Sequence, residues 1–410
     1  MRTRMYGGVR GRRTKKVGRN SKIFVFLLLD CACWLGPCYI SGRTFNIVKD
    51  MKRIIALFAF MVIGAIYATE SDACTGISLN SANGSRVVAR TVEWAATPMQ
   101  CGYVVAPRGH AHQSYTPTGE NGLKYKAVYG YVGIYTEYEP FVVEGVNEAG
   151  LAAGLFFFPQ YGEYAPYDKK QDEKTICDMQ FVSWVLSQFS TIDQLKDAMD
   201  EVCLVTLDSK IGAVHWRIAQ PDGRMVVLEV VGGVPRFYEN KLGVLTNAPG
   251  FQWHMTNLNN YVNLEPGSAP DNTVVPGITL KALGHGSGML GLPGDFTSPS
   301  RFVRATFYQA TAPVWETGFE TVVQAFHILN NFDIPIGSQH ARADIPKGLP
   351  SATQFTSATD QTAMKFYYRT AWNSNIRCID LMDIDFRKIK YQSHPLDQVQ
   401  QQPVEIVKVK

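Results

Sequence analysis

The chain has 410 residues, of which 46% are hydrophobic and 19% charged, a composition that suits a globular protein with a large core. Its net charge of +4 arises at the start, where residues 1–22 hold nine of the 40 Lys and Arg and no acid. The other 31 basic residues are outnumbered by 36 acidic ones, so we expect no nucleic-acid partner.

Residues 1–50 have the pattern of neither a domain nor a linker. They join the basic run to a short apolar segment, residues 23–29. A complete signal-peptide pattern begins only at Met51. We therefore interpret residues 1–50 as an upstream extension or as a leader that is discarded.

Residues 51–73 have the pattern of a secretory signal peptide. A basic start precedes an apolar core at residues 54–68, and Ser71 and Ala73 are the small residues three and one positions before a cut. Cleavage after Ala73 would make Cys74 the first residue of the mature chain. No later apolar run is long enough to span a bilayer. We expect an exported protein, periplasmic or secreted, without a stable membrane anchor in its mature form.

Cys74 would then carry a thiol and a free α-amino group on one residue. An α-amino group titrates at roughly 7.7–8.0 and a thiol at about 8.5, so near neutrality the amine can take the thiol proton. This is the N-terminal form of nucleophile–base pairing. Two alternatives remain, a lipid-attachment site in an exported lipoprotein with a binding role and one half of a disulfide. Five cysteines follow residue 73, and an odd count leaves at least one thiol unpaired.

Strands and blocks of helices follow along residues 74–410, which we expect to form one catalytic domain. A hairpin of residues 75–79 and 86–91 turns at Asn83-Gly84 and would tie Cys74 into a sheet. The other predicted elements, in chain order, are strands 128–135, 140–146 and 151–158, helices 176–189 and 192–202 (the second capped by Thr191), strands 213–219, 224–231, 235–238 and 242–245, helices 253–262, 300–310 and 319–330, strands 354–358, 363–369 and 376–381, and a loose tail from residue 388. Antiparallel hairpins and grouped helices favour an α+β class, two antiparallel sheets with helices outside them.

Five short motifs stand far apart along the mature chain. They are residues 74–76 (Cys-Thr-Gly), 90–94 (Arg-Thr-Val-Glu-Trp), 144–151 (Glu-Gly-Val-Asn-Glu-Ala-Gly-Leu), 245–254 (from Leu-Thr-Asn-Ala-Pro to Trp-His) and 291–302 (Gly-Leu-Pro-Gly-Asp-Phe-Thr-Ser-Pro-Ser-Arg-Phe). In this order they resemble the choloylglycine hydrolase family of N-terminal nucleophile hydrolases, which includes bile salt hydrolases and penicillin V acylases. The resemblance implies a four-layer αββα sandwich, no cofactor, and a homo-oligomer, which by resemblance to the family would be a homotetramer. The eight histidines lack metal-ligand spacing, so we expect no metal.

The resemblance also implies site residues. Cys74 matches the nucleophile, and Arg90 matches the arginine beside the thiol. Asn247 matches the asparagine whose amide helps form the oxyanion hole, and Arg301 matches a second arginine at the site. Glu93 stands where the family usually has Asp, which contacts the amino group of the nucleophile. Taken singly, the asparagine would more often form a turn, the arginines would be ion-pair residues, and Glu93 would merely pair with Arg90.

Phe157 stands where bile salt hydrolases often have Asn and penicillin V acylases often have Tyr. Its backbone N–H would still serve an oxyanion hole, and strand alternation should send it to the face opposite Phe156 and Phe158. We expect Phe157, Trp94 and Tyr161 to bind the substrate. His254 is interpreted as structural.

The expected function is that of an exported amidase. It would hydrolyse glycine- or taurine-conjugated bile acids through the Cys74 thiolate and a thioester acyl-enzyme. Penicillin V acylase and N-acyl homoserine lactone acylase activities are alternatives in the same class, and a non-enzymatic lipoprotein acylated at Cys74 is an alternative from another class.

Overall fold

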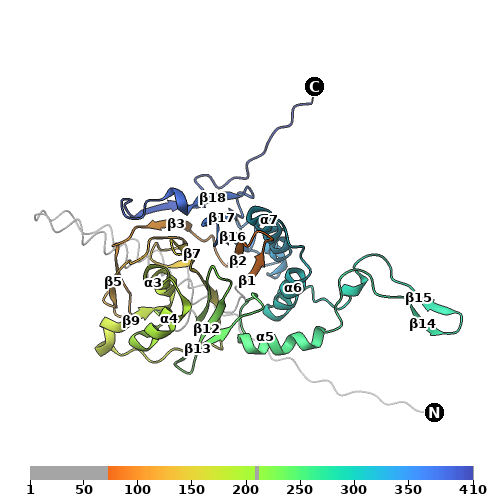
Figure 1. Ribbon diagram of the computed structural model, residues 1–410, viewed down its shortest axis with the longest axis horizontal. Helices are drawn as coiled ribbons and strands as arrows, with labels where there is room; N and C mark the ends of the chain where they lie inside the picture. Colours follow the sequence, from red (N-terminus) through yellow and green to blue (C-terminus); the bar gives the residue numbers. More distant parts are fainter. Residues whose placement is uncertain (1–72, 208–211, 410) are drawn as a thin grey trace, which may run out of the picture. The chain divides into compact units, whose positions relative to one another are not determined.

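The computed structural model describes residues 73–207 and 212–409 (Figure 1). The predicted upstream extension, residues 1–50, and all of the predicted signal peptide except Ala73 lie outside the described residues. Both assignments therefore stay predictions. Within the described chain, two antiparallel sheets dominate the structure.

The smaller sheet carries the start of the described chain. Its strands run in the order β1–β2–β16–β17–β18, with bounds β1 Cys74–Asn80, β2 Arg86–Glu93, β16 Thr353–Asp360, β17 Lys365–Thr370 and β18 Arg377–Asp380. In the β1–β2 register, Cys74 lies opposite Val92 and Gly76 lies opposite Arg90. The predicted hairpin is thus confirmed, and it brings Cys74 next to the end of β2 that carries Glu93.

The larger sheet has the order β13–β12–β11–β8–β7–β6–β3–β19. The bounds are β3 Cys101–Ala106, β6 Tyr131–Thr136, β7 Val142–Asn147, β8 Ala152–Phe157, β11 Val214–Ala219, β12 Met225–Val231, β13 Val234–Glu239 and β19 Gln392–Pro395. Six of these strands match predicted ones, whereas β3 and β19 were not predicted. β19 contradicts the loose tail from residue 388, because it pairs with β3 and is followed by the buried Leu396. Residues 398–409 beyond it are exposed.

Helices cover the outer face of each sheet. α3 (Phe181–Gln188) packs on β7 and β8 of the larger sheet, whereas α6 (Ser298–Ala310) and α7 (Gly318–Leu329) pack on β1, β2 and β16 of the smaller one. The two sheets face each other, since Arg217 of β11 donates to the carbonyl of Ala89 in β2. The predicted four-layer αββα sandwich is therefore confirmed.

Capping side chains fix where several helices begin. Thr191 precedes α4 (Ile192–Ala198) and forms a capping box with Gln194, as the predicted cap requires. Thr317 forms the same arrangement with Glu320 at the start of α7. α4 ends four residues early and continues as a 3₁₀ turn, Met199–Glu201. α5 (Phe251–Asn257) likewise continues as a 3₁₀ turn, Leu258–Tyr261.

The predicted helix over residues 176–189 is wrong in its first part. Residues Thr175–Cys177 form β9, which pairs in parallel with β10 (Cys203–Val205), and a 3₁₀ turn, Asp178–Gln180, precedes α3. The backbone N–H of Cys177 donates to the Ser114 hydroxyl, and the Asp178 carboxylate accepts from the next residue's N–H. Side-chain oxygens thus accept hydrogen bonds from backbone N–H groups, in competition with the pairing within a helix.

The predicted strand over residues 242–245 is also wrong. Only one isolated bridge forms there, between Gly76 and Leu245. The side chain of Asn240 accepts from the N–H of Gly243 and donates to the carbonyl of Val244. This local pairing closes a turn in place of a strand.

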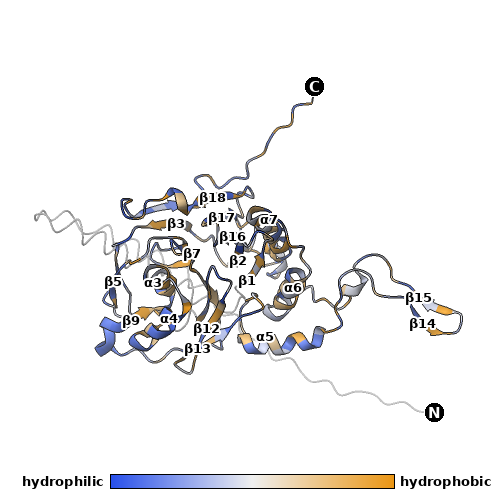
Figure 2. Cartoon of the chain, viewed as in Figure 1, coloured by the Kyte–Doolittle hydropathy of each residue, from blue (hydrophilic) through white to orange (hydrophobic). Residues whose placement is uncertain are grey.

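Two further small hairpins were not predicted, β4–β5 (Ala111–Gln113 and Lys124–Lys126) and β14–β15 (Asn272–Val275 and Ile278–Leu280). We call residues 272–280 the β14–β15 arm. All of its strand residues are exposed, including Val274, Ile278 and Leu280, and Figure 2 shows its strands largely in the hydrophobic colour. Among the described residues, no helix has the length and apolar character needed to cross a membrane.

Candidate active site

Cys74 is buried at the start of β1, with 6% of its surface exposed. Its backbone nitrogen donates to Oδ1 of Asn247 at 2.8 Å. Ala73 precedes it, is fully buried, and packs in a small cluster with Ala95, Ile334 and Ala352. In this structure the nitrogen of Cys74 belongs to the peptide bond with Ala73, and its N–H points at the Asn247 side chain.

Arg301 joins Cys74 to Asn247. It lies in the first turn of α6 and is buried. Its Nη2 donates to Oδ1 of Asn247 at 2.7 Å, while its Nη1 donates to the carbonyl of Cys74 and to Oγ1 of Thr75. The structure thus brings together three of the predicted site residues and adds Thr75, which sequence reasoning missed although it lies in the first family motif.

The Asn247 amide also reaches the larger sheet. Its Nδ2 donates to the carbonyl of Phe157 at the end of β8, at 2.8 Å. The nitrogen of a side-chain amide carries two hydrogens, so the second N–H of Asn247 is not used by this hydrogen bond. Phe157 is half-buried, whereas Phe156 and Phe158 are fully buried, in keeping with the predicted alternation. The role of the Phe157 backbone N–H stays a prediction.

Glu93, the last residue of β2, is buried near the same cluster, with 3% of its surface exposed. Its Oε1 accepts a hydrogen bond from the hydroxyl of Thr353, and its Oε2 has no hydrogen-bond partner among the described residues. Burial raises the pKa of Glu93 to about 8, and the nearby charge of Arg301 opposes that rise.

Arg90 lies between the two sheets. Its guanidinium sits 3.9 Å from the centre of the Phe156 ring and 3.5 Å from a carboxylate oxygen of Glu144. Glu144 also pairs with Arg217, at 2.5 Å. The alternative that Glu93 merely pairs with Arg90 is therefore not what the structure shows. Sequence reasoning missed Glu144 and Arg217, and the only available signal was the place of Glu144 at the start of the third motif.

The charges around the thiol act in opposite directions. Burial is the largest influence and raises the pKa of the Cys74 thiol above its ordinary value. The positive charges of Arg90 and Arg301 lower that pKa, whereas the carboxylate of Glu93 raises it. Two arginines therefore favour the thiolate in a site whose burial disfavours it.

Trp94 and Tyr161, the other predicted substrate-binding residues, lie less centrally. Trp94 follows Glu93 directly, is half-buried, and donates from its ring nitrogen to Thr97 at 3.0 Å. Tyr161 is 48% exposed, and its ring packs on Phe158. Neither has a described contact with Cys74, so their roles stay predictions.

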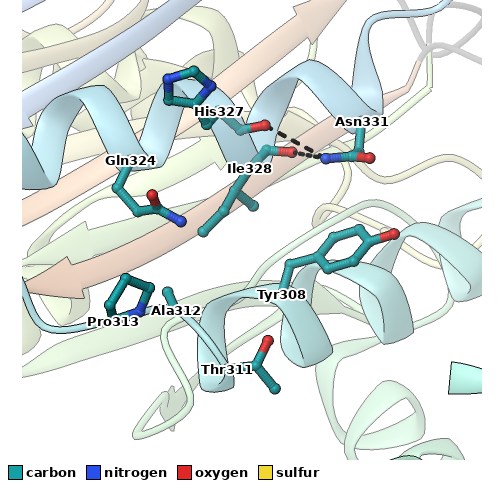
Figure 3. Close-up of a pocket in the computed structure, with 8 residues that line it drawn as sticks. All are labelled: Tyr308, Thr311, Ala312, Pro313, Gln324, His327, Ile328 and Asn331. Atoms are coloured by element: carbon teal, nitrogen blue, oxygen red, sulfur yellow. Dashed lines mark hydrogen bonds between the residues drawn. The ribbon is translucent and has the colours of Figure 1, made fainter. Parts of the chain in front are cut away.

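Two other features bear on what this chain could bind. In residues 73–207 and 212–409, no three His, Cys, Asp or Glu side chains converge as a metal ion would require. A hollow of about 240 Å³ lies between α6 and α7, lined by residues such as Tyr308, Pro313 and His327 (Figure 3). None of its lining residues belongs to the cluster around Cys74.

Comparison with known proteins points to one family. The family model for linear amide C–N hydrolases of the choloylglycine hydrolase family matches residues 74–395. The bile salt hydrolase/transferase of Clostridium perfringens is 31% identical over 77% of this chain and 95% of its own length. The penicillin V acylase of Pectobacterium atrosepticum is 23% identical over 83% of this chain and 89% of its own length. The crystal structure of a variant of conjugated bile acid hydrolase from Clostridium perfringens is similar, with a TM-score of 0.71, 27% identity, and coverage of 82% of this chain and 100% of that chain.

The effect of the Arg90 charge on the pKa of the Cys74 thiol should be measurable. Arg90→Gln removes a positive charge that lowers the pKa of Cys74, so the midpoint of thiol alkylation by iodoacetamide should move up by about one pH unit. Rates of alkylation measured across pH on folded protein give this midpoint.

Glu144→Gln is the matched control for that variant. It breaks the same buried ion pair but removes a negative charge, so the midpoint should not rise. An unchanged midpoint in Arg90→Gln, or an equal rise in both variants, would show that the charge of Arg90 does not act on the thiol.

Proposed function

The chain belongs to the choloylglycine hydrolase family of linear amide C–N hydrolases, and we propose that it cleaves the amide bond of glycine- or taurine-conjugated bile acids. The observation that carries this proposal is the convergence of Cys74, Asn247 and Arg301 in one hydrogen-bonded cluster. The substrate class is supported by the relatives named as bile salt hydrolases, which are more similar in sequence than the penicillin V acylase relative.

Export and processing are part of the proposal. Cleavage before Cys74 would convert its amide nitrogen into an α-amine while leaving it 2.8 Å from Oδ1 of Asn247. The amine would thus be held in place by an acceptor that the fold already provides. A thiol and an amine on the same residue form a nucleophile with its own base.

The acylation step follows from this arrangement. The α-amine takes the thiol proton, and the Cys74 sulfur forms a bond to the amide carbon of the substrate. The developing oxyanion accepts from the remaining N–H of Asn247, with the Phe157 backbone N–H as the second donor. An oxyanion donor of this kind contributes about 3–4 kcal/mol to lowering the barrier.

Collapse of this intermediate breaks the C–N bond. The α-ammonium group returns its proton to the leaving glycine or taurine nitrogen, and the acyl group stays on sulfur as a thioester. Water then attacks the thioester and gives a proton to the amine. The C–S bond breaks, and the α-ammonium group returns that proton to the departing thiolate. The products are the free bile acid and the regenerated thiol.

Phe157 favours a large apolar acyl group. It is half-buried, and its carbonyl is bonded to the same Asn247 amide that would face the oxyanion. Each Å² of apolar surface removed from water contributes about 25 cal/mol. A steroid covers more of such a wall than a phenoxyacetyl group does, so the apolar residue suits a bile acid better.

We therefore expect kcat/KM for conjugated bile acids to exceed that for penicillin V on one enzyme preparation. Phe157→Ala should lower the ratio of the two values, because it removes apolar surface that a steroid would cover, whereas Phe157→Leu keeps an apolar side chain and should largely preserve the ratio. A tenfold or greater preference of the wild type for penicillin V would overturn the bile acid assignment and favour the acylase alternative.

A homo-oligomer is the second part of the proposal, and the β14–β15 arm supports it. Val274 and Ile278 are about half exposed, and Leu283 just beyond the arm is fully exposed. Residues 263–294 contain only three charged residues, Glu265, Asp271 and Lys281. Exposed apolar surface with few charges is typical of a protein–protein interface, and we propose that a second copy of the chain covers it.

Light scattering after size-exclusion chromatography tests this assembly. The wild type should have a mass that is a multiple of the monomer, and Val274→Lys combined with Ile278→Lys should lower it. Val404→Lys combined with Ile406→Lys places the same charges on the exposed C-terminal tail and should leave the mass unchanged. A monomeric wild type, or an unchanged mass in the arm variant, would contradict the proposal.

A further inference from the structure

Two buried histidines contact the backbone on either side of the Asn247 side chain. Nε2 of His215 lies 3.0 Å from the carbonyl oxygen of Thr246, and Nε2 of His254 lies 2.9 Å from the carbonyl oxygen of Asn247. Both rings are fully buried. A carbonyl oxygen only accepts hydrogen bonds, so each histidine carries a proton on Nε2 and donates it to this segment.

Each histidine is itself fixed by an aromatic ring. His215 of β11 stacks on Phe158, with ring centroids 4.4 Å apart and planes 5° apart. His254 of α5 stacks on Phe302 of α6, at 4.6 Å and 9°. The two imidazoles therefore reach residues 246–247 from different elements, one from a strand of the larger sheet and the other from α5.

A third anchor holds the other side of the segment. The Ser298 hydroxyl at the start of α6 accepts from the backbone N–H of Asn247 at 2.9 Å and lies 2.9 Å from Oγ1 of Thr246. The backbone N–H and the carbonyl of Asn247 are thus both bonded to side chains. With its backbone held in this way, the amide of Asn247 has little freedom to turn away from Cys74.

His215 has a further partner, the buried carboxylate of Glu229 on β12. Nδ1 of His215 lies 3.3 Å from Oε1 of Glu229, and this oxygen accepts a hydrogen bond from the backbone N–H of Phe251 at 2.7 Å. Phe251 is the first residue of α5, the helix that carries His254. Glu229 therefore connects the strand that bears one histidine to the helix that bears the other.

We propose that His254 and His215 are positioning residues that hold the Thr246–Asn247 backbone, and with it the Asn247 amide, in the orientation needed at the reaction centre. The inference rests on the proposed function, which gives Asn247 its role toward the oxyanion. Neither histidine touches Cys74, so neither is assigned a catalytic role.

His254 has one property that a purely stabilising residue would lack. Its Nδ1 is buried and has no hydrogen-bond partner among the described residues, which costs stability. Burial also lowers the pKa of His254 to about 4, so the ring is neutral near pH 7. What the ring offers at this place is the Nε2–H bond to Asn247 and its stack on Phe302.

Paired substitutions separate positioning from packing. His254→Gln keeps an N–H donor near the position of Nε2, whereas His254→Asn is too short to reach the carbonyl of Asn247. We expect kcat of His254→Asn to fall by about 10- to 100-fold with little change in KM, because a misplaced donor acts mainly in the transition state. His254→Gln should keep most of the activity. If His254→Asn does not fold, His254→Phe keeps the stacked ring without the Nε2–H and should show the same loss of kcat.

Rates are measured with a glycine-conjugated bile acid and with penicillin V, because either amide would form an oxyanion. If the enzyme acts on penicillin V alone, the proposed substrate is wrong. The histidine variants can then still be compared by their rates on penicillin V. In an Asn247→Ala background, His254→Asn should cause no further loss, since the group that it positions is gone.

Three outcomes would overturn the positioning role. One is an equal loss in His254→Gln and His254→Asn, and another is an additive loss in the Asn247→Ala background. The third is an Asn247→Ala variant with unchanged kcat, which removes the oxyanion role of Asn247 as well. Affinity for the aldehyde of the same bile acid, whose adduct with Cys74 carries an oxygen at the oxyanion position, should fall in His254→Asn in parallel with kcat.

Discussion

The hydrogen bonds of one side chain, the Asn247 amide, connect three layers of the fold. Oδ1 accepts from the nitrogen of Cys74 in the smaller sheet and from Arg301 in α6, while Nδ2 donates to the carbonyl of Phe157 in the larger sheet. One side chain thus joins both sheets and a helix, so the packing of the sandwich and the geometry around Cys74 depend on each other. A change in the spacing of the sheets would break the hydrogen bonds that Asn247 makes to Cys74 and Phe157.

That arrangement requires several charges to be buried beside the thiol. Arg90 and Arg217 share the carboxylate of Glu144 between the sheets, which leaves one positive charge in excess there. Burying an ion costs several kcal/mol unless partners and hydrogen bonds compensate. Glycine makes room for this cluster, because a Cβ at Gly154 would collide with the carboxylate of Glu144, and one at Gly76 would press on the Phe156 ring. The excess charge is of the sign that favours a thiolate, which offsets part of the effect of burial on Cys74.

Much of the fold follows from the sequence, because alternating strands and turn residues are local signals. The hairpin that holds Cys74 and the helix that carries Arg301 were both predicted from such patterns. β19 was not predicted, since its polar residues form a strand only by pairing with β3. The predicted start of helix 176–189 was wrong because the hydroxyl of Ser114, distant in sequence, accepts a hydrogen bond from the backbone N–H of Cys177. The family motifs pointed to Cys74, Asn247 and Arg301, but the bonds of Glu144 and His254 depend on tertiary contacts that no local pattern encodes.

If a free N-terminal Cys74 is the nucleophile, the mass of the enzyme trapped during turnover should reveal both its first residue and its acyl group. Active protein is quenched in acid while a conjugated bile acid is being hydrolysed. The masses of the intact chain and of its N-terminal peptide are then measured by mass spectrometry. We predict a chain that begins at Cys74 and a transient increase equal to the bile acyl group on that residue, absent in Cys74→Ala. Active protein that retains residues before Cys74, a lipid on its sulfur, or an acyl group on another residue would rule out Cys74 as an N-terminal nucleophile.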